Sequence, residues 1–202
     1  MLANRNTSTR RVNSLQAIQT NIKGVDLTLQ TQPGLFSPRQ VDVGTLSMLS
    51  CVDFTTEDKV LDLGCGYGVV GILAARLIGQ EKVFLLDADA AAIECAKANA
   101  QANGLPELSV THSDGFSQFQ EAGFTRILCN PPYHTDFAVA RQFILKGFNR
   151  MVIGGSMWFV TKRDKWYRNK MGAVFGGVSV QEINSYYVIS AEKRRESYAG
   201  KV

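Results

Sequence analysis

Val60-Leu-Asp-Leu-Gly-Cys-Gly-Tyr-Gly-Val-Val-Gly71 is the stretch of this 202-residue sequence that decides the fold. Its first residues are mostly apolar, as in a strand that is buried on both faces of a parallel sheet. The alternate glycines that follow favour a tight turn in which the backbone can approach a ligand closely. The apolar residues from Val69 to Ile78 then predict a helix packed back on the strand. This succession predicts a βα turn at the carboxyl edge of a parallel sheet, where open α/β folds bind nucleotides.

The spacing of the glycines separates two kinds of nucleotide site. A dinucleotide site of the type Gly-x-Gly-x-x-Gly would need a third glycine at the position of Val69. The glycines instead alternate, and an acid precedes them: Asp62, Gly64, Gly66 and Gly68. This pattern resembles motif I of the class I S-adenosylmethionine (SAM) methyltransferases. The resemblance implies that the turn, Cys65 included, lies against the methionine end of SAM.

Acidic residues follow the next strands, where the rest of such a ligand would lie. Asp87 comes about twenty residues after the glycines and is placed to accept hydrogen bonds from two ribose hydroxyls. Asp89 is better suited to cap the helix that follows, although it could share the ribose. In the methyltransferase pattern the acid after the third strand receives the adenine amino group, and the next backbone N–H meets a ring nitrogen. Asp114 and Phe116 take those places by position.

The tetrapeptide Asn130-Pro131-Pro132-Tyr133 follows another apolar strand and suits an amine acceptor. Its two prolines hold the backbone extended and rigid. An exocyclic amine of a nucleobase is a poor nucleophile because its lone pair is delocalised into the ring. The Asn130 side-chain oxygen and the Pro131 carbonyl can accept both N–H bonds of the amine, while Tyr133 stacks on the base. Catalysis would then be positioning and hydrogen bonding, without a strong general base.

With His134 after it, this tetrapeptide resembles the Asn-Pro-Pro-Phe-His of the ribosomal-RNA guanine-N2 methyltransferases, in the small methyltransferase domain family. The segment from Pro33 to Gly44 resembles the part of that family that covers the cofactor and helps wall the substrate pocket. Phe36, Tyr133 and His134 are therefore expected at the substrate. The resemblance extends over about residues 29–193. It implies a SAM-dependent N-methyltransferase whose favoured acceptor is guanine N2 of ribosomal RNA.

Other functions remain open on the sequence. Adenine N6 in RNA or DNA presents the same kind of amine, and methylation of a protein glutamine also uses Asn-Pro-Pro-Tyr. A non-catalytic SAM-binding module that supports another subunit is a further alternative, but it has no physical need for the amine-orienting tetrapeptide. The basic excess, 22 Lys and Arg against 18 Asp and Glu, weakly favours a nucleic acid over a protein acceptor.

Strands and helices alternate along the chain, which predicts an α/β, Rossmann-like fold. We expect a seven-stranded, mostly parallel sheet with helices on both faces and an antiparallel C-terminal hairpin. Residues 21–194 would form the methyltransferase domain. Residues 1–20 read as a polar, basic N-terminal tail and residues 195–202 as a C-terminal tail.

The region around the helix expected at 166–175 is the most basic part of the chain. Trp166 and Tyr167 lie among its cations, which are Lys162, Arg163, Lys165, Arg168 and Lys170. Such a region is either an RNA contact or a solvated helix face. The close ribosomal enzymes carry an additional N-terminal domain that helps hold RNA, and no such domain is recognised here. Substrate capture would then fall to this helix, the tails, a homodimer or an accessory partner.

Cysteine and histidine usage favours a protein without a metal site. The four cysteines form no Cys-x-x-Cys pair, and only two histidines are present, so neither a zinc site nor a disulfide framework is indicated. The N-terminus lacks the apolar core of a secretion signal, and no stretch has the length of a membrane span. We therefore expect a cytoplasmic protein with reduced thiols and no membrane contact.

Overall fold

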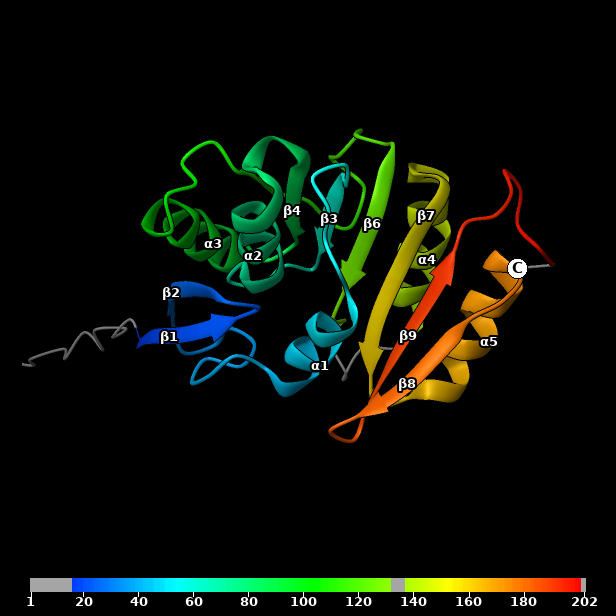
Figure 1. Cartoon of the computed structure of the whole chain (residues 1–202), viewed down its shortest axis with the longest axis horizontal. Helices are drawn as coiled ribbons and strands as arrows, with labels where there is room; N and C mark the ends of the chain where they lie inside the picture. Colours follow the sequence, from blue (N-terminus) through cyan, green and yellow to red (C-terminus); the bar gives the residue numbers. More distant parts are fainter. Residues whose placement is uncertain (1–15, 132–136, 201–202) are drawn as a thin grey trace, which may run out of the picture.

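The computed structural model describes residues 16–131 and 137–200 and has a seven-stranded sheet at its centre (Figure 1). The strand order is β5-β4-β3-β6-β7-β9-β8. Strands β3 to β7 are parallel to one another, and β9 runs antiparallel to both β7 and β8. The predicted Rossmann-like fold class, with its antiparallel C-terminal hairpin, is confirmed.

The elements alternate along the chain as the sequence pattern indicates. The strands of the large sheet are β3 (Val60–Leu63), β4 (Val83–Asp87), β5 (Ser109–His112), β6 (Phe124–Cys129), β7 (Met151–Thr161), β8 (Ser179–Ile183) and β9 (Tyr186–Glu192). The helices are α1 (Val43–Cys51), α2 (Val69–Ile78), α3 (Ala90–Ala102), α4 (Phe137–Arg150) and α5 (Asp164–Phe175), with a short 3-10 turn η1 (Gln80–Lys82). None of the helices in the described parts of the chain has both the length and the apolar content of a membrane span.

Helices cover both faces of the sheet, and each face has its own apolar cluster. Helices α1, α2 and α3 contribute to one cluster, and α4 and α5 contribute to the other. In Figure 1, α4 and α5 lie behind the sheet. The strands between the two clusters are buried on both faces, which explains why all four residues of β3 are buried and three of them are apolar.

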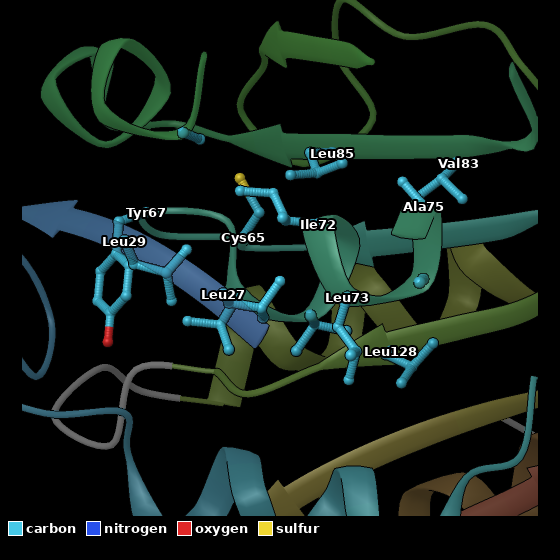
Figure 2. Packing of buried hydrophobic residues seen from close by; sticks show 14 of the residues in the cluster. Leu27, Leu29, Cys65, Tyr67, Ile72, Leu73, Ala75, Val83, Leu85 and Leu128 are labelled. Atoms are coloured by element: carbon cyan, nitrogen blue, oxygen red, sulfur yellow. The ribbon is translucent and has the colours of Figure 1, made fainter. Parts of the chain in front are cut away.

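Helix α2 is buried almost all round because a second, smaller sheet covers its outer side. This sheet is the antiparallel hairpin of β1 (Gln16–Ile22) and β2 (Val25–Thr31). Leu27 and Leu29 of β2 lie in the same apolar cluster as the α2 side chains and as Leu85 and Leu128 of the large sheet (Figure 2). A helix apolar on all sides is accordingly sandwiched rather than exposed.

Asn99 of α3 and Asn103, which caps the C-terminus of this helix, bind the free edge of β2. The side-chain oxygen of Asn99 accepts from the Gln30 N–H at 2.6 Å, and its Nδ2 donates to the Gln30 carbonyl at 2.8 Å. Asn103 makes the corresponding pair of bonds with Thr28, at 3.1 and 2.8 Å. Asn99 Nδ2 also donates to the Tyr67 carbonyl, at 2.9 Å. The hairpin, α3 and the glycine turn are therefore held together through one asparagine.

The N-terminal tail expected at residues 1–20 is too long. Strand β1 begins at Gln16, so residues 16–20 belong to the hairpin. Only Ile18 and Ile22 of this strand are buried, and the other positions are mostly polar and exposed. So few apolar positions give a weak strand signal, and the strand forms because β2 offers a partner.

The C-terminal tail expected at residues 195–202 is wrong for residues 195–200, which pack on α4 and α5. The Tyr198 ring lies 5.0 Å from that of Phe148, and its hydroxyl donates to the Leu145 carbonyl at 3.2 Å. The backbone N–H groups of Ala199 and Gly200 donate to carbonyls at the end of α5. Lys193 is only 4% exposed, and its Nζ donates to the Met151 carbonyl at 2.9 Å.

Candidate active site

A cavity of about 360 Å³ lies at the carboxyl ends of β3, β4 and β6. Its walls come from the glycine turn, from the loops after β4, β5 and β6, and from the segment that precedes α1. This is the edge of the sheet at which the sequence predicts a ligand, and the volume suits a small molecule. Residues far apart in the chain meet here because all these parallel strands end at the same edge.

The glycine turn exposes its backbone to the cavity. Gly64 and Gly66 have φ of +76° and +55°, and a Cβ placed on either would meet no atom within 4 Å. A ligand can therefore approach the backbone at both positions. Gly68 has a different reason to be glycine, since φ is +95° and a Cβ would lie 2.9 Å from the Ile72 side chain. It begins α2 and does not line the cavity, unlike Cys65.

Asp62 links the two elements on either side of the glycine turn. Its side chain is 3% exposed, lines the cavity, and accepts the N–H of Gly71 at 2.8 Å. Burial raises the pKa of the Asp62 carboxyl from 3.8 to about 7, and the nearby Asp87 adds to the rise, against the lowering effect of the Gly71 bond. The carboxyl predicted to touch the cofactor thus also ties β3 to α2.

Asp87, the acid predicted for the ribose, lies against the glycine turn. One carboxylate oxygen accepts the Gly66 N–H at 2.8 Å and the other accepts the Asp89 N–H at 2.9 Å. Asp89 caps α3 by accepting the Ala91 N–H at 2.8 Å, which confirms the predicted cap. Both aspartates line the cavity, and Asp87 is half-buried.

The loop after β5 brings Asp114 to the cavity but not the side chain of Phe116. Asp114 is exposed and lines the cavity with Ser113 and Gly115. The Phe116 ring is 5% exposed and belongs to the apolar cluster under α4 and α5. Any contact of Phe116 with a ligand would have to come from its backbone, as the sequence analysis assumed.

Asn130 is held by the start of α1. Its Nδ2 donates to the Asp42 carboxylate and to the Thr45 hydroxyl, both at 2.9 Å. Asp42 also caps α1 by accepting the Thr45 N–H at 2.8 Å. A carboxylate can only accept, so the Asn130 amide nitrogen faces α1 and the side-chain oxygen lies on the other side of the amide.

Asp42 and Thr45 line the cavity with Asn130 and Pro131. The sequence analysis predicted no role for Asp42 or Thr45. Asp42 lies in a segment that was singled out, Asp42-Val43-Gly44, and its N-cap position was the available signal. Its contact with Asn130 joins positions 88 residues apart, which no local pattern reveals.

The remaining predicted substrate residues are partly placed. Phe36 is 47% exposed and lines the cavity together with Leu35. Pro132, Tyr133 and His134 lie outside the described residues. Helix α4 adds Val139 and Phe143 to the wall, and the sequence analysis gave neither residue a place at the site.

The cavity is acidic. Five acidic side chains line it, and no Lys, Arg or His occurs among the described lining residues: Asp42, Asp62, Asp87, Asp89 and Asp114. Burial and the neighbouring Asp62 raise the pKa of the Cys65 thiol well above 9.0, so this cysteine is no thiolate nucleophile. The described residues contain no cluster of His, Cys, Asp and Glu able to hold a metal ion. Such a cavity favours a cationic ligand rich in hydrogen-bond donors and disfavours one with phosphates.

The methyltransferase small domain family matches residues 26–191 of the chain. A Bacillus subtilis protein named uncharacterized protein YbxB is 30% identical over 85% of this chain and 89% of the relative. Ribosomal RNA small subunit methyltransferase C of Cronobacter sakazakii is 36% identical over 77% of this chain and 46% of the relative. The chain spans about half the length of the ribosomal RNA methyltransferases that it matches.

Solved structures share the arrangement. The Thermus thermophilus 16S rRNA N2 G1207 methyltransferase (RsmC), solved in complex with AdoMet and guanosine, has a TM-score of 0.83 and 29% identity. The match covers 92% of this chain and 52% of that one. TrmN from Thermus thermophilus, with a TM-score of 0.64 and 23% identity, shares the fold.

Proposed function

The chain belongs to the methyltransferase small domain family, and we propose that it transfers the methyl group of SAM to an exocyclic amine of a nucleobase in RNA. Guanine N2 of ribosomal RNA is the acceptor that we favour, which places the enzyme in the cytoplasm. The relatives named as ribosomal RNA methyltransferases and the neighbour bound to AdoMet and guanosine support this choice. The observation that carries the proposal is the joint presence of an acidic cavity and an oriented Asn130.

The cavity residues fit SAM. The ligand carries a sulfonium and an ammonium, which five carboxylates favour, and it has no phosphate that they would repel. Gly64 and Gly66 would face its methionine end, where a Cβ would fill the space that they leave open. Asp87 would accept from the ribose hydroxyls and Asp114 from the adenine amino group. Bound SAM supplies an electrophilic methyl group.

The acceptor side is prepared by hydrogen bonds within the protein. Asp42 and Thr45 bind the amide nitrogen of Asn130, so the amide is oriented with its oxygen on the side away from α1, and this oxygen is the atom that would accept from an N–H donor. This oxygen and the Pro131 carbonyl would accept the two N–H bonds of the amine and hold its lone pair out of the plane of the base. The lone pair would form the new N–C bond as the S–CH3 bond of SAM breaks and its electron pair stays on the sulfur, and the methylated amine would then lose a proton to water. No residue needs to act as a strong base.

The test is transfer of labelled methyl from SAM to unmodified ribosomal RNA, naked and assembled into subunits, followed by nucleoside analysis. We expect labelled N2-methylguanosine. Asn130→Ala should lower kcat by about 100-fold or more, since it removes an acceptor aligned in the transition state. Asp42→Asn keeps an N-cap residue but lets the Asn130 amide turn over, so a smaller loss of kcat is expected.

Calorimetric binding of SAM to each variant is the control, because a fall in turnover has meaning only where the cofactor still binds. Asn130→Ala should retain SAM binding. Labelled N6-methyladenosine would overturn the choice of base. Label in a protein glutamine, or tight SAM binding without transfer to any acceptor, would overturn RNA methylation itself.

A further inference from the structure

The carboxyl edge of the sheet continues past the cavity into a basic, aromatic surface. We propose that this surface, made of Phe137, Lys162, Arg163, Lys165 and Trp166, binds the single-stranded RNA that flanks the acceptor nucleotide. The inference rests on the proposed function and adds to it the place where the polymer is held. It resolves the choice, open on the sequence, between an RNA contact and a solvated helix face.

The aromatic part of the surface is already assembled. The rings of Phe137 and Trp166 are stacked, with centroids 4.3 Å apart and planes within 10° of each other. The guanidinium carbon of Arg163 lies 5.6 Å from the centroid of the Phe137 ring. A shallow hollow of about 380 Å³ is lined by these three residues together with Asp164, Lys165 and Asn169. Flat rings beside a cation form a platform on which bases of any sequence can stack.

The charge of the surface is largely uncompensated. Five of the nine residues from 162 to 170 are Lys or Arg and one is an acid, Asp164. Asp164 is paired with Arg168 at 2.8 Å. Lys162, Arg163 and Lys165 are exposed, and none of them forms an ion pair within the described residues. Partial desolvation and then the nearby Arg141 lower the pKa of Lys170, as expected where cations gather.

The surface lies beside the acceptor site. Strands β6 and β7 are parallel neighbours in register, with Cys129 opposite Phe159, so Asn130 and Lys162 leave the sheet at the same edge. This edge faces the bottom of Figure 1, where α1 and the β8–β9 turn also lie. Lys162 Nζ is 4.8 Å from the centroid of the Tyr186 ring, which in turn packs on Gly44 next to the α1 cap. The basic surface therefore continues from the residues that orient Asn130.

The cavity is acidic and the neighbouring surface is basic, and this contrast in charge identifies the ligand. The cavity carries five carboxylates, so phosphates next to an inserted nucleotide are repelled from it. The neighbouring cations attract them. A polymer with a neutral base to insert and an anionic backbone to hold matches both halves. A protein acceptor has no corresponding repeat of charge and aromatic rings.

A charge-neutralising variant tests the surface directly. Lys162→Gln/Arg163→Gln/Lys165→Gln removes three exposed cations, and Lys97→Gln/Lys146→Gln/Arg194→Gln removes three exposed cations elsewhere. Fluorescence anisotropy of labelled single-stranded RNA would be measured over a range of salt concentrations. We expect the first variant to bind at least about tenfold more weakly and to lower the salt slope by about 2, from ~0.7 for each lost phosphate contact. The control should keep the wild-type slope.

The two tryptophans of the chain give an independent, paired measurement. Trp158→Phe leaves Trp166, which lies in the surface, and Trp166→Phe leaves Trp158, which packs with the cluster on the other side of the sheet. RNA should quench the fluorescence of Trp166 and leave that of Trp158 unchanged, because only the first can stack with a base.

Equal salt slopes in the two triple variants, or equal quenching of both tryptophans, would overturn the inference. Quenching by acidic peptide but not by RNA would also overturn it, in favour of a protein ligand. SAM affinity and kcat at saturating RNA should stay as in the wild type while KM for RNA rises. These readouts measure binding, so the inference can fail while RNA methylation stands, and a failure of methylation leaves the binding result intact.

Discussion

The position of Asp62 in the cavity and its burial have opposite effects on its ionisation. It lies in the cavity wall, where a negative charge suits a cationic ligand, and it is almost fully buried. Burial raises the pKa of its carboxyl to about 7, so the folded protein holds a proton there that the unfolded chain, with a pKa near 3.8, has lost. Ionisation of Asp62 therefore costs stability as the pH rises from about 4 to about 7, and the cost is constant above that.

Asp62→Asn should remove this pH dependence, since the amide oxygen can still accept the Gly71 N–H. The stability of the variant relative to the wild type should increase with pH, by up to about 4 kcal/mol at ~1.4 kcal/mol for each pKa unit. The measurement is urea unfolding of both proteins across this pH range. Parallel curves would show that Asp62 is ionised throughout and that its burial is better compensated than the pKa indicates.

Single residues were predictable where one local property determines them. Gly64 and Gly66 could be assigned because a positive φ beside a ligand requires glycine, and Asp89 because an N-cap follows from its place before a helix. Phe116 was placed by position, and its ring lies in the core because the loop turns at Gly115. Asp42 was missed because its contact depends on α1 meeting β6 in space.

At the scale of elements, the approach of α2 to β4 depends on Gly71. A Cβ at this position would lie 2.4 Å from both Cγ and Cδ1 of Leu85, so the helix could not keep its distance from the strand. Gly172 in α5 offers a contrast, since nothing lies within 4 Å of its Cβ position and its φ is helical.

Gly71→Ala should destabilise the protein by about 1–3 kcal/mol through overpacking. Gly172→Ala should instead stabilise it by roughly 0.5–1 kcal/mol, because alanine loses less backbone entropy in a helix. Chemical unfolding of the two variants checks both signs. A stabilised Gly71→Ala would mean that Leu85 can move aside at little cost.

Elements with a strong apolar period were predicted closely, and the helix expected from Val69 to Ile78 is α2, with the same bounds. Strand β7 follows α4 directly. It begins at Met151 and includes Gly154 and Gly155. Glycine pairs usually interrupt a strand, but the Gly154 N–H and the Gly155 carbonyl are bound by the backbone of Lys193. That support comes from the other end of the domain.

At the scale of the whole molecule, the C-terminal segment completes the face formed by α4 and α5. Lys193 is buried with its Nζ bonded to the Met151 carbonyl, 3.7 Å from the Glu196 carboxylate and 4.8 Å from the centroid of the Phe148 ring. The Tyr198 ring makes an edge-to-face contact with the same ring, at a centroid distance of 5.0 Å. The basic sequence of this segment favoured a solvated tail. It packs instead because its partners in α4 lie about fifty residues earlier in the chain, where no local pattern reveals them.

A chain ending after Arg194 should therefore be less stable by about 2–4 kcal/mol, which exposes Phe148 and removes the bonds of residues 198–200. For a protein of this size each kcal/mol corresponds to roughly 2–4 °C in Tm. Tyr198→Phe, which keeps the ring and loses only the hydroxyl bonds, should show a smaller fall. The Tm of each protein is measured by thermal unfolding with circular dichroism as the probe. Equal Tm values for the truncated and full chains would contradict the packing.

The asparagine pair formed by Asn99 of α3 and its C-cap, Asn103, affects how molecules of this protein meet one another. An unpaired strand edge is a template on which a second chain can grow, and fibrils and swapped dimers begin in this way. Asn99 and Asn103 occupy that template on β2, each with the donor and acceptor that a neighbouring strand would bring. The two side-chain amides take the place of a neighbouring strand, but they offer no backbone edge with which a further strand could pair. The β2 edge of the hairpin is thereby closed to pairing with a strand of another chain.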